Sequence, residues 1–360
     1  MLSRFRFVLP LALCAFVMGQ ASAVAQEPIK GLRVFHSGHS FHVFMPGILI
    51  DIARKADIKD HTQLGLSSIG GSRVIQHWAP AQTSIAKDSN DAVLPTDTIH
   101  VASTGRFPAA GELTVQTSDG EAVVTYTGIK GNSFTGCKGG KGTLVLSKKV
   151  GATTNAAKEA LKTGKVDVFT MAPIYLPDDG IEKFVALALE NNPKIRVTVQ
   201  ENWLPWDHYD VKFKPPVGKI DHNAPTVESL KKLHAPYFQS IDEHVAELNK
   251  KYKTNAVLVA PVGQAVILLR EKIIEGKAPG LKEQNDLFTD AIGHAKAPLQ
   301  ALVAYVHYVS VYQRSPVGLP MPAVLGKSKG EESENLNRLL QEIAWQAVTT
   351  HPLSGVKATR

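Results

Sequence analysis

Short apolar runs alternate along this chain with longer stretches in which apolar residues recur at helical spacing. Short runs of this kind are typical of buried strands, and the longer stretches are typical of helices packed on a sheet. The short runs cover residues 32–37, 61–68, 166–173, 195–200 and 255–261. The helical stretches cover residues 45–57, 153–164, 180–192, 226–253, 262–275 and 298–312. This alternation predicts an α/β fold, a three-layer α/β/α sandwich with a five-stranded parallel sheet.

The helical periodicity disappears between about residue 81 and residue 151. This segment is dense in Gly, Thr, Ser and Val, and turn signals such as "SDGE" and "KGN" separate its strand-like runs. We therefore predict a small all-β unit, 81–151, inserted into an α/β domain formed by 26–80 and 152–360. Two interpretations of the insert stay open, an elaborated loop over the sheet edge and a module that binds a surface or a glycan.

The first 25 residues have the pattern of a secretory signal peptide. Arg4 and Arg6 precede an apolar core, and small residues at Ala21, Ala23 and Ala25 follow it. The apolar core is shorter than the roughly 20 residues that a membrane span requires. We predict cleavage near residue 25 and a secreted or periplasmic mature protein.

Composition excludes several classes of protein. The chain is 44% hydrophobic and 20% charged, as globular proteins are, and its net charge of +7 is not gathered into a Lys/Arg run of the kind that binds nucleic acid. No other apolar stretch approaches the length of a membrane span. Cys14 lies in the predicted signal, so Cys137 would be left without a partner for an internal disulfide.

The stretch "HSGHSFH", residues 36–42, joins the first predicted strand to the first predicted helix. Gly38 permits a tight turn, and Ser40 would lie near a helix N-terminus, where backbone N–H groups favour a developing anion. An acyl-transfer nucleophile belongs at such a place, although an N-cap serine would fit it too. Zinc binding by His36, His39 and His42 is disfavoured, because their spacing splays the rings across the junction. We predict no metal and no other cofactor.

A serine hydroxyl becomes nucleophilic when a base removes its proton and a third group orients that base. Asp290 and His294 supply this pair in "TDAIGH", which follows the helical stretch 262–275 and precedes the apolar helix 298–312. Both can therefore lie over the carboxyl end of the sheet, where ligands bind in doubly wound folds. The other interpretation makes Asp290 a helix-start residue and His294 a solvated loop residue.

These motifs resemble those of the GDSL/SGNH hydrolase superfamily, a divergent secreted bacterial type. "GHSF" resembles the first block, which makes Ser40 the nucleophile and puts His39 where the family has Asp. "SSIGGSRVIQHW" resembles the second block, so Gly71 or Gly70 would donate a backbone N–H to the oxyanion beside the N–H of Ser40. "DAIGH" resembles the last block with one extra residue, which makes Asp290 the orienting carboxylate and His294 the base. The resemblance implies a flavodoxin-like SGNH hydrolase fold.

The chain departs from the family pattern at the third block, because no G-x-N-D motif follows the third strand. Gln200 and Asn202, after the fourth strand, are the nearest amides that could donate to an oxyanion. Tryptophans near the predicted site could stack on a sugar ring, although most tryptophans are core or pocket wall. The substrate-pocket candidates are His39, Trp78, Gln200, Asn202, Trp203 and Trp206.

Two functions from different classes follow. The first is a secreted serine hydrolase, an esterase that cleaves a small acyl ester such as an O-acetyl group on a carbohydrate. The second is a non-catalytic carbohydrate- or surface-binding protein on the same scaffold. The insert resembles short β-modules of phage structural and bacterial surface proteins through "VTYTG" and "SFTGC", which says little about chemistry.

Overall fold

The computed structural model describes residues 29–210, 212–326 and 330–358. The predicted signal peptide, 1–25, lies outside the described residues. Within them, no helix combines the length and the hydropathy needed to cross a membrane.

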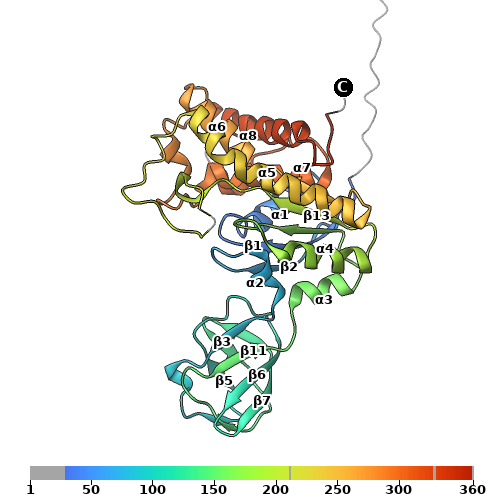
Figure 1. Cartoon of the computed structure of the whole chain (residues 1–360), viewed down its shortest axis with the longest axis vertical. Coiled ribbons are helices and arrows are strands. Elements are labelled where there is room, and N and C mark those ends of the chain that lie inside the picture. The colour runs from blue at the N-terminus through green and yellow to red at the C-terminus, as the bar shows by residue number, and fades with distance from the viewer. Residues whose placement is uncertain (1–28, 211, 327–329, 359–360) are drawn as a thin grey trace, which may run out of the picture.

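Five parallel strands form the central sheet, in the order β14-β13-β12-β1-β2 (Figure 1). Since β1 lies inside the sheet and β2 at its edge, the chain runs outward once and then back across the sheet, as in flavodoxin-like doubly wound folds. The strands are β1 (Arg33–Gly38), β2 (Thr62–Ser68), β12 (Val168–Met171), β13 (Arg196–Gln200) and β14 (Val257–Ala260). The predicted α/β sandwich with a five-stranded parallel sheet is confirmed.

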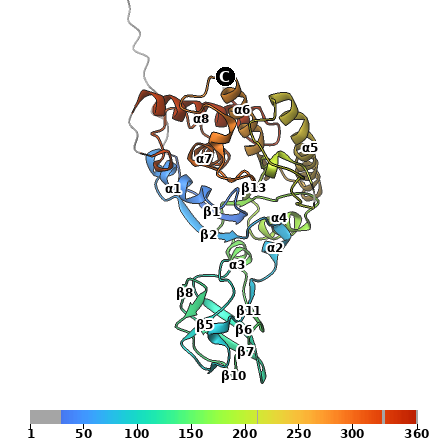
Figure 2. The same cartoon turned by 90° about the vertical axis from the view of Figure 1, so that its left-hand side faces the viewer.

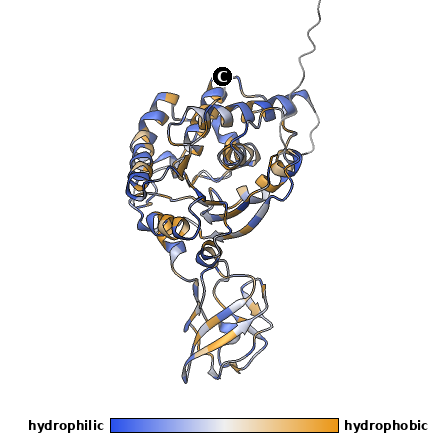
Figure 3. Ribbon diagram, turned by 90° about the vertical axis from the view of Figure 1, so that its right-hand side faces the viewer, coloured by the Kyte–Doolittle hydropathy of each residue, from blue (hydrophilic) through white to orange (hydrophobic). Residues whose placement is uncertain are grey.

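Two apolar clusters cover the two faces of the sheet. The first cluster joins α1 (Met45–Lys55), α6 (Val262–Ile274), α7 (Ala297–Tyr312) and α8 (Glu331–Thr350). The second joins α2 (Val74–Trp78), α3 (Ala156–Lys162), α4 (Asp179–Asn191) and α5 (Val227–Tyr252). Figure 2 shows α7 enclosed by other helices, and Figure 3 shows hydrophobic and hydrophilic residues interleaved along the outer ones. Short 3₁₀ turns cover Lys87–Ser89, Pro205–Asp207, Gln284–Leu287 and Ala323–Leu325.

Two helices lie outside the stretches expected from the sequence. Helix α8 begins with three glutamates in its first turn, which suit the positive end of the helix dipole. This charged start makes the apolar periodicity of the helix hard to recognise in the sequence. Its apolar face buries Leu340, Ile343 and Ala347 against the first cluster. Helix α2 spans only five residues, too few for a periodic pattern to be read.

The inserted β unit contains three small antiparallel sheets, with the strand orders β3-β11-β6-β7, β5-β9-β8 and β10-β4. It has its own apolar core, built around residues such as Leu113, Val124 and Phe134. Cys137 is a buried free cysteine in this core. Figures 1 and 2 show the unit projecting from the α/β part beside α2 and α3. The strands are β3 (Gln82–Ser84), β4 (Val93–Leu94), β5 (Thr98–His100), β6 (Gly111–Thr117), β7 (Gly120–Tyr126), β8 (Gly128–Lys130), β9 (Ser133–Thr135), β10 (Gly142–Thr143) and β11 (Lys149–Ala152).

One side chain ties together the two ends of the insertion. The Asn155 side-chain amide donates to the backbone oxygens of His77, Trp78 and Ala79 at 2.8, 3.2 and 3.1 Å, so the chain returns close to the point where it left. A short linker can therefore bridge the gap. We expect a chain in which a Gly/Ser linker replaces residues 81–151 to elute without aggregates in size exclusion and to melt cooperatively. An aggregated product, or a melt without a cooperative transition, would show that the unit belongs to the main core.

Candidate active site

The turn after β1 presents Ser40 at the carboxyl end of the sheet. A Cβ on Gly38 would lie 2.9 Å from His42 and 3.0 Å from Ala172, so Gly38 is required for its missing side chain rather than for a left-handed backbone. Residues 39–44 form turns that lead into α1, where the N-cap is Phe44 and no side chain caps the helix. The interpretation of Ser40 as the N-cap of α1 is therefore wrong. Ser40 is partly exposed, and its hydroxyl does not cap this helix.

The loop before α7 presents Asp290 and His294. Phe288 and Ala295 pair across its base, and Gly293, at φ 95°, reverses the chain between the two residues. Asp290 Oδ1 accepts from the N–H groups of Gly293 and His294 at 3.1 and 3.2 Å. The turn at Gly293 thus brings the Asp290 carboxylate back onto the His294 imidazole.

Ser40, His294 and Asp290 form a continuous hydrogen-bonded chain. The Ser40 Oγ lies 2.9 Å from His294 Nε2, and His294 Nδ1 lies 2.6 Å from Asp290 Oδ2. Because the carboxylate accepts the proton on Nδ1, the neutral ring has a lone pair on Nε2 for the serine proton. Partial burial alone would raise the pKa of Asp290, but the hydrogen bonds from the side chain and backbone of His294 lower it, which keeps the carboxylate ionised.

Aromatic side chains pack against the His294 imidazole on its buried side. The ring of Phe41 meets His294 edge-on at 5.6 Å and stacks on Trp203 at 4.2 Å. Trp203 is buried, and its Nε1–H donates to the backbone oxygen of Gly293 at 2.9 Å. Trp203 therefore anchors the His294 loop from inside the protein.

Gln200 and Asn202 are also buried, and their amides are occupied by the protein. Gln200 Oε1 lies 2.7 Å from both His42 Nδ1 and His307 Nε2, while its Nε2 donates to Phe41 O at 3.1 Å. Asn202 Oδ1 accepts from Gln200, and Asn202 Nδ2 donates to Pro173 O at 2.7 Å. These amides join the turn after β1 to the neighbouring strands, and a substrate oxyanion would have to displace those bonds.

A histidine cluster lies beneath the Ser40 turn. The Thr170 Oγ1 lies 2.9 Å from His36 Nδ1 and 3.0 Å from His42 Nε2, and the His42 ring meets His307 at 5.0 Å. Burial lowers the pKa of His42 to about 4 and also lowers the pKa values of His36 and His307. No sequence pattern singles out His307, because α7 is apolar around its whole circumference.

His39 is a further buried, neutral histidine. It is 1% exposed, and burial lowers its pKa to about 3. Its Nδ1 accepts weakly from Phe41 N–H at 3.4 Å, and its Nε2 lies 3.5 Å from Asn202 Nδ2. His39 thus places an uncharged ring next to Ser40 in the sequence.

Backbone N–H groups in the turns after β1 and β2 are free to serve as oxyanion donors. Neither Ser40 nor Gly70 nor Gly71 donates its backbone N–H to any residue that the structure describes. Gly71 has φ +55° in the turn that follows β2, the strand next to β1. The two turns therefore open at the same edge of the sheet.

The remaining tryptophans lie in different places. One face of Trp78 carries the Lys158 ammonium at 4.0 Å, and its edge meets Phe184, so it packs between α2, α3 and α4. Trp206 is half-buried and lies 4.8 Å from the ring of Phe213. A Cβ on Gly71 would lie 3.2 Å from that same ring. Phe213, which no sequence pattern marks, thus links Trp206 to the Gly71 turn.

One group in the described part of the chain has the composition of a metal site. Ligand atoms of Glu201, Asp242 and His351 lie within 4.8 Å of one another. The His351 Nδ1 accepts from Leu353 N–H at 3.2 Å, so the proton of the neutral ring is on Nε2, which faces Asp242 Oδ1 at 3.2 Å. A metal would need that nitrogen unprotonated. The His351 Nε2 and Asp242 Oδ1 atoms are buried and make no hydrogen bond with each other, and a protonated Nε2 does not suit a cation.

Comparison with known proteins gives little information about this chain. No protein-family model matches the chain, and no curated protein matches it. Among solved structures, the chain is similar to one described as "Peptidoglycan O-acetylesterase in action, 5 min", at 7% identity, with 79% of this chain and 91% of that chain covered and a TM-score of 0.27. A likeness this slight leaves the site to be argued from its own geometry.

Proposed function

We propose that this protein is a serine ester hydrolase, with Ser40 as nucleophile, His294 as general base and Asp290 as the carboxylate that orients His294. The observation that carries the proposal is the pair of hydrogen bonds at 2.9 and 2.6 Å from Ser40 through His294 to Asp290. The three side chains come from two segments about 250 positions apart. A serine hydroxyl bonded to an imidazole that is itself bonded to a carboxylate is the arrangement that acyl transfer requires.

The reaction follows from these contacts. His294 Nε2 takes the Ser40 proton as Oγ attacks the ester carbonyl, and the N–H groups of Ser40 and Gly71 stabilise the oxyanion. His294 then returns the proton to the leaving alcohol, and the acyl group stays on Ser40. A water molecule, deprotonated by His294, hydrolyses the acyl-enzyme and restores the serine.

The substrate we propose is a small acyl ester, such as an O-acetyl group on a carbohydrate. The side chains of His294 and Asp290 are 33% and 44% exposed, so the site is shallow and open to an ester on a larger molecule. Trp206 and Phe213 offer half-buried aromatic surface next to the Gly71 turn, where a sugar ring could stack. We further propose that the protein acts outside the cytoplasm and that the β unit binds a surface or a glycan.

The second candidate function is that of a non-catalytic carbohydrate- or surface-binding protein on the same scaffold. The observation that favours it is the occupation of Gln200 and Asn202 within the interior, so that neither of these two amides is free to be a third oxyanion donor. Such a protein would bind a glycan and leave its esters intact.

Labelling with a fluorophosphonate separates the two functions, because only an activated serine is phosphonylated. We expect the chain from residue 26 to be labelled stoichiometrically, with the phosphonate mapped to Ser40 by mass spectrometry. Ser40→Ala should not be labelled. If the unmodified protein is not labelled but binds an acetylated glycan without deacetylating it, the hydrolase proposal is wrong.

A further inference from the structure

Three backbone oxygens of the loop that carries Asp290 and His294 accept hydrogen bonds from one other segment of the chain. Trp203 Nε1 donates to Gly293 O at 2.9 Å, and Trp206 N–H donates to Ile292 O at 3.0 Å. The third contact joins His222 Nε2 to Asp290 O at 3.2 Å. The loop is thus held through its backbone, and the contact nearest the Asp290 carboxylate is the one made by His222.

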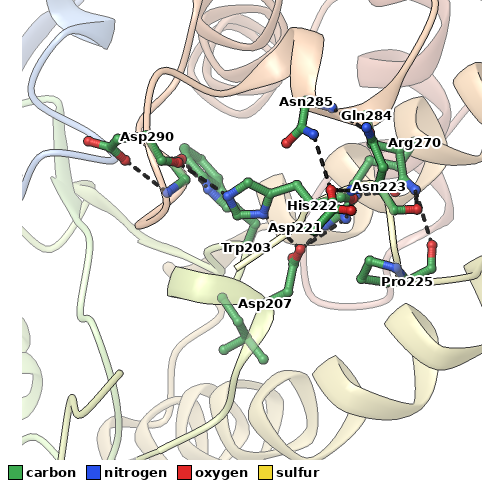
Figure 4. A network of polar contacts seen from close by, with 12 residues as sticks. Trp203, Asp207, Asp221, His222, Asn223, Pro225, Arg270, Gln284, Asn285 and Asp290 are labelled. Atoms are coloured by element: carbon green, nitrogen blue, oxygen red, sulfur yellow. Dashed lines mark hydrogen bonds and ion pairs between the residues drawn. The ribbon is translucent and has the colours of Figure 1, made fainter. Parts of the chain in front are cut away.

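The His222 ring is itself fixed on several sides. Its Nδ1 lies 2.8 Å from Asp207 Oδ2 (Figure 4). The ring also packs against Phe288, with ring centroids 4.3 Å apart and planes tilted by 40°. The His222 side chain is 5% exposed. Both ring nitrogens face oxygen acceptors, and each contact needs a hydrogen on the nitrogen that makes it.

A buried ion pair holds Asp207 in turn. Arg270, 1% exposed, makes a bidentate contact with Asp207 at 2.5 and 3.0 Å and donates to His222 O at 2.8 Å. Burial alone would raise the pKa of Asp207, but bonds from His222 and Arg270 lower it, so the carboxylate stays charged. The Arg270 Nε donates to Gln284 Oε1 at 2.6 Å. Since four of the five Arg270 N–H groups have acceptors in this network, the position of His222 is tightly determined.

The backbone around Asp207 supports the same conclusion. Trp206 and Asp207 have φ values of 56° and 47°, in the left-handed region that non-glycine residues rarely adopt. Such residues persist where the surrounding contacts over-determine them, and they concentrate at functional sites. Here the unusual backbone directs the Asp207 carboxylate toward Arg270 and His222, while the Trp206 N–H reaches Ile292 O.

We propose that His222 is a positioning residue that holds the backbone of Asp290 and thereby fixes the carboxylate that orients His294. The inference rests on the proposed function and adds to it a residue that lies outside the three hydrogen-bonded side chains. The Asp290 carboxylate bonds to His294 and to the loop's own N–H groups, and to no other described residue. Its direction is therefore set by the backbone that His222 holds.

A pair of substitutions separates the two ring nitrogens. His222→Asn puts an amide N–H near the position of Nδ1, which keeps the contact with Asp207 and loses the one with Asp290. His222→Gln reaches the position of Nε2, which keeps the contact with Asp290. We expect His222→Asn to lower kcat for p-nitrophenyl acetate about 10- to 100-fold with KM little changed, as misplacement of a catalytic group does. His222→Gln should recover most of kcat.

Hydrogen exchange tests the same inference without reference to activity. Amides in 289–294 should exchange faster in His222→Asn than in the unmodified protein or in His222→Gln, while the melting temperature stays close to that of the unmodified protein. The matched control is His100→Asn in the β unit, whose ring also bonds a side chain, that of Ser133. Unchanged exchange and kcat in His222→Asn would overturn the inference. An unmodified protein that neither hydrolyses the ester nor labels at Ser40 would overturn the proposed function, and exchange would then still decide whether His222 holds the loop.

Discussion

Replacing Ser40 by alanine should lower kcat for p-nitrophenyl acetate by a factor on the order of 10³ or more, because the nucleophile is removed. His294→Ala should cost a similar factor, since its Nε2 lies 2.9 Å from the serine oxygen and no other described side chain bonds that hydroxyl. The double variant should be little worse than either single one, because the two residues act as a unit. Asp290→Asn should cost less, because the amide oxygen can still accept from His294 Nδ1.

Ser37→Ala is the matched control for this series. Ser37 lies three positions before Ser40, is buried, and has an Oγ without a hydrogen-bond partner among the described residues. Its removal should leave kcat and the stoichiometry of phosphonylation unchanged. Equal activity in Ser40→Ala and Ser37→Ala would show that hydrolysis comes from a contaminant or from another group, and the assignment of Ser40 would fail.

Most of the fold prediction rested on the short-range spacing of apolar residues along the sequence. The strands and helices of the α/β part begin and end within a few residues of the ranges expected from the sequence, because burial on a sheet imposes a local spacing. Helices α2 and α8 and the sheets of the β unit were not predicted by this reasoning. The strands of the β unit are as short as two residues, so their pairing is decided by contacts distant in sequence.

The order of motifs along the chain picked out Ser40, Asp290 and His294, which lie within hydrogen-bonding distance. Their catalytic roles, and those of Gly70 and Gly71, stay predictions. Proximity to a strand end also picked out Gln200 and Trp203, but it could not reveal that His307 and Phe41 bury them. Burial depends on residues from other elements, so position in the sequence alone does not separate a substrate contact from a supporting one.

The buried histidines beneath the site predict a fold that is unstable in mild acid. Burial lowers the pKa of His39 to about 3 and that of His42 to about 4, and it lowers the pKa values of His36 and His307 as well. In the unfolded chain, each histidine titrates near pH 6.5. Below that pH the unfolded state binds protons that the folded state excludes, so the free energy of unfolding falls as the pH falls toward the folded pKa values.

Four histidines contribute to this loss. His39 and His42 should each cost about 2 kcal/mol between pH 7.5 and pH 5, and the lowered pKa values of His36 and His307 act in the same direction. Buried Glu201, whose pKa is raised to about 8, acts in the opposite direction, so the net fall is smaller than the sum over the histidines. Urea unfolding followed by tryptophan fluorescence at pH 7.5, 6 and 5 should show the midpoint falling steeply below pH 6.5. His307→Gln should flatten that dependence by about one proton. A midpoint at pH 5 equal to that at pH 7.5 would mean that these rings already bear protons in the folded state, which the 5.0 Å separation of the His42 and His307 rings opposes.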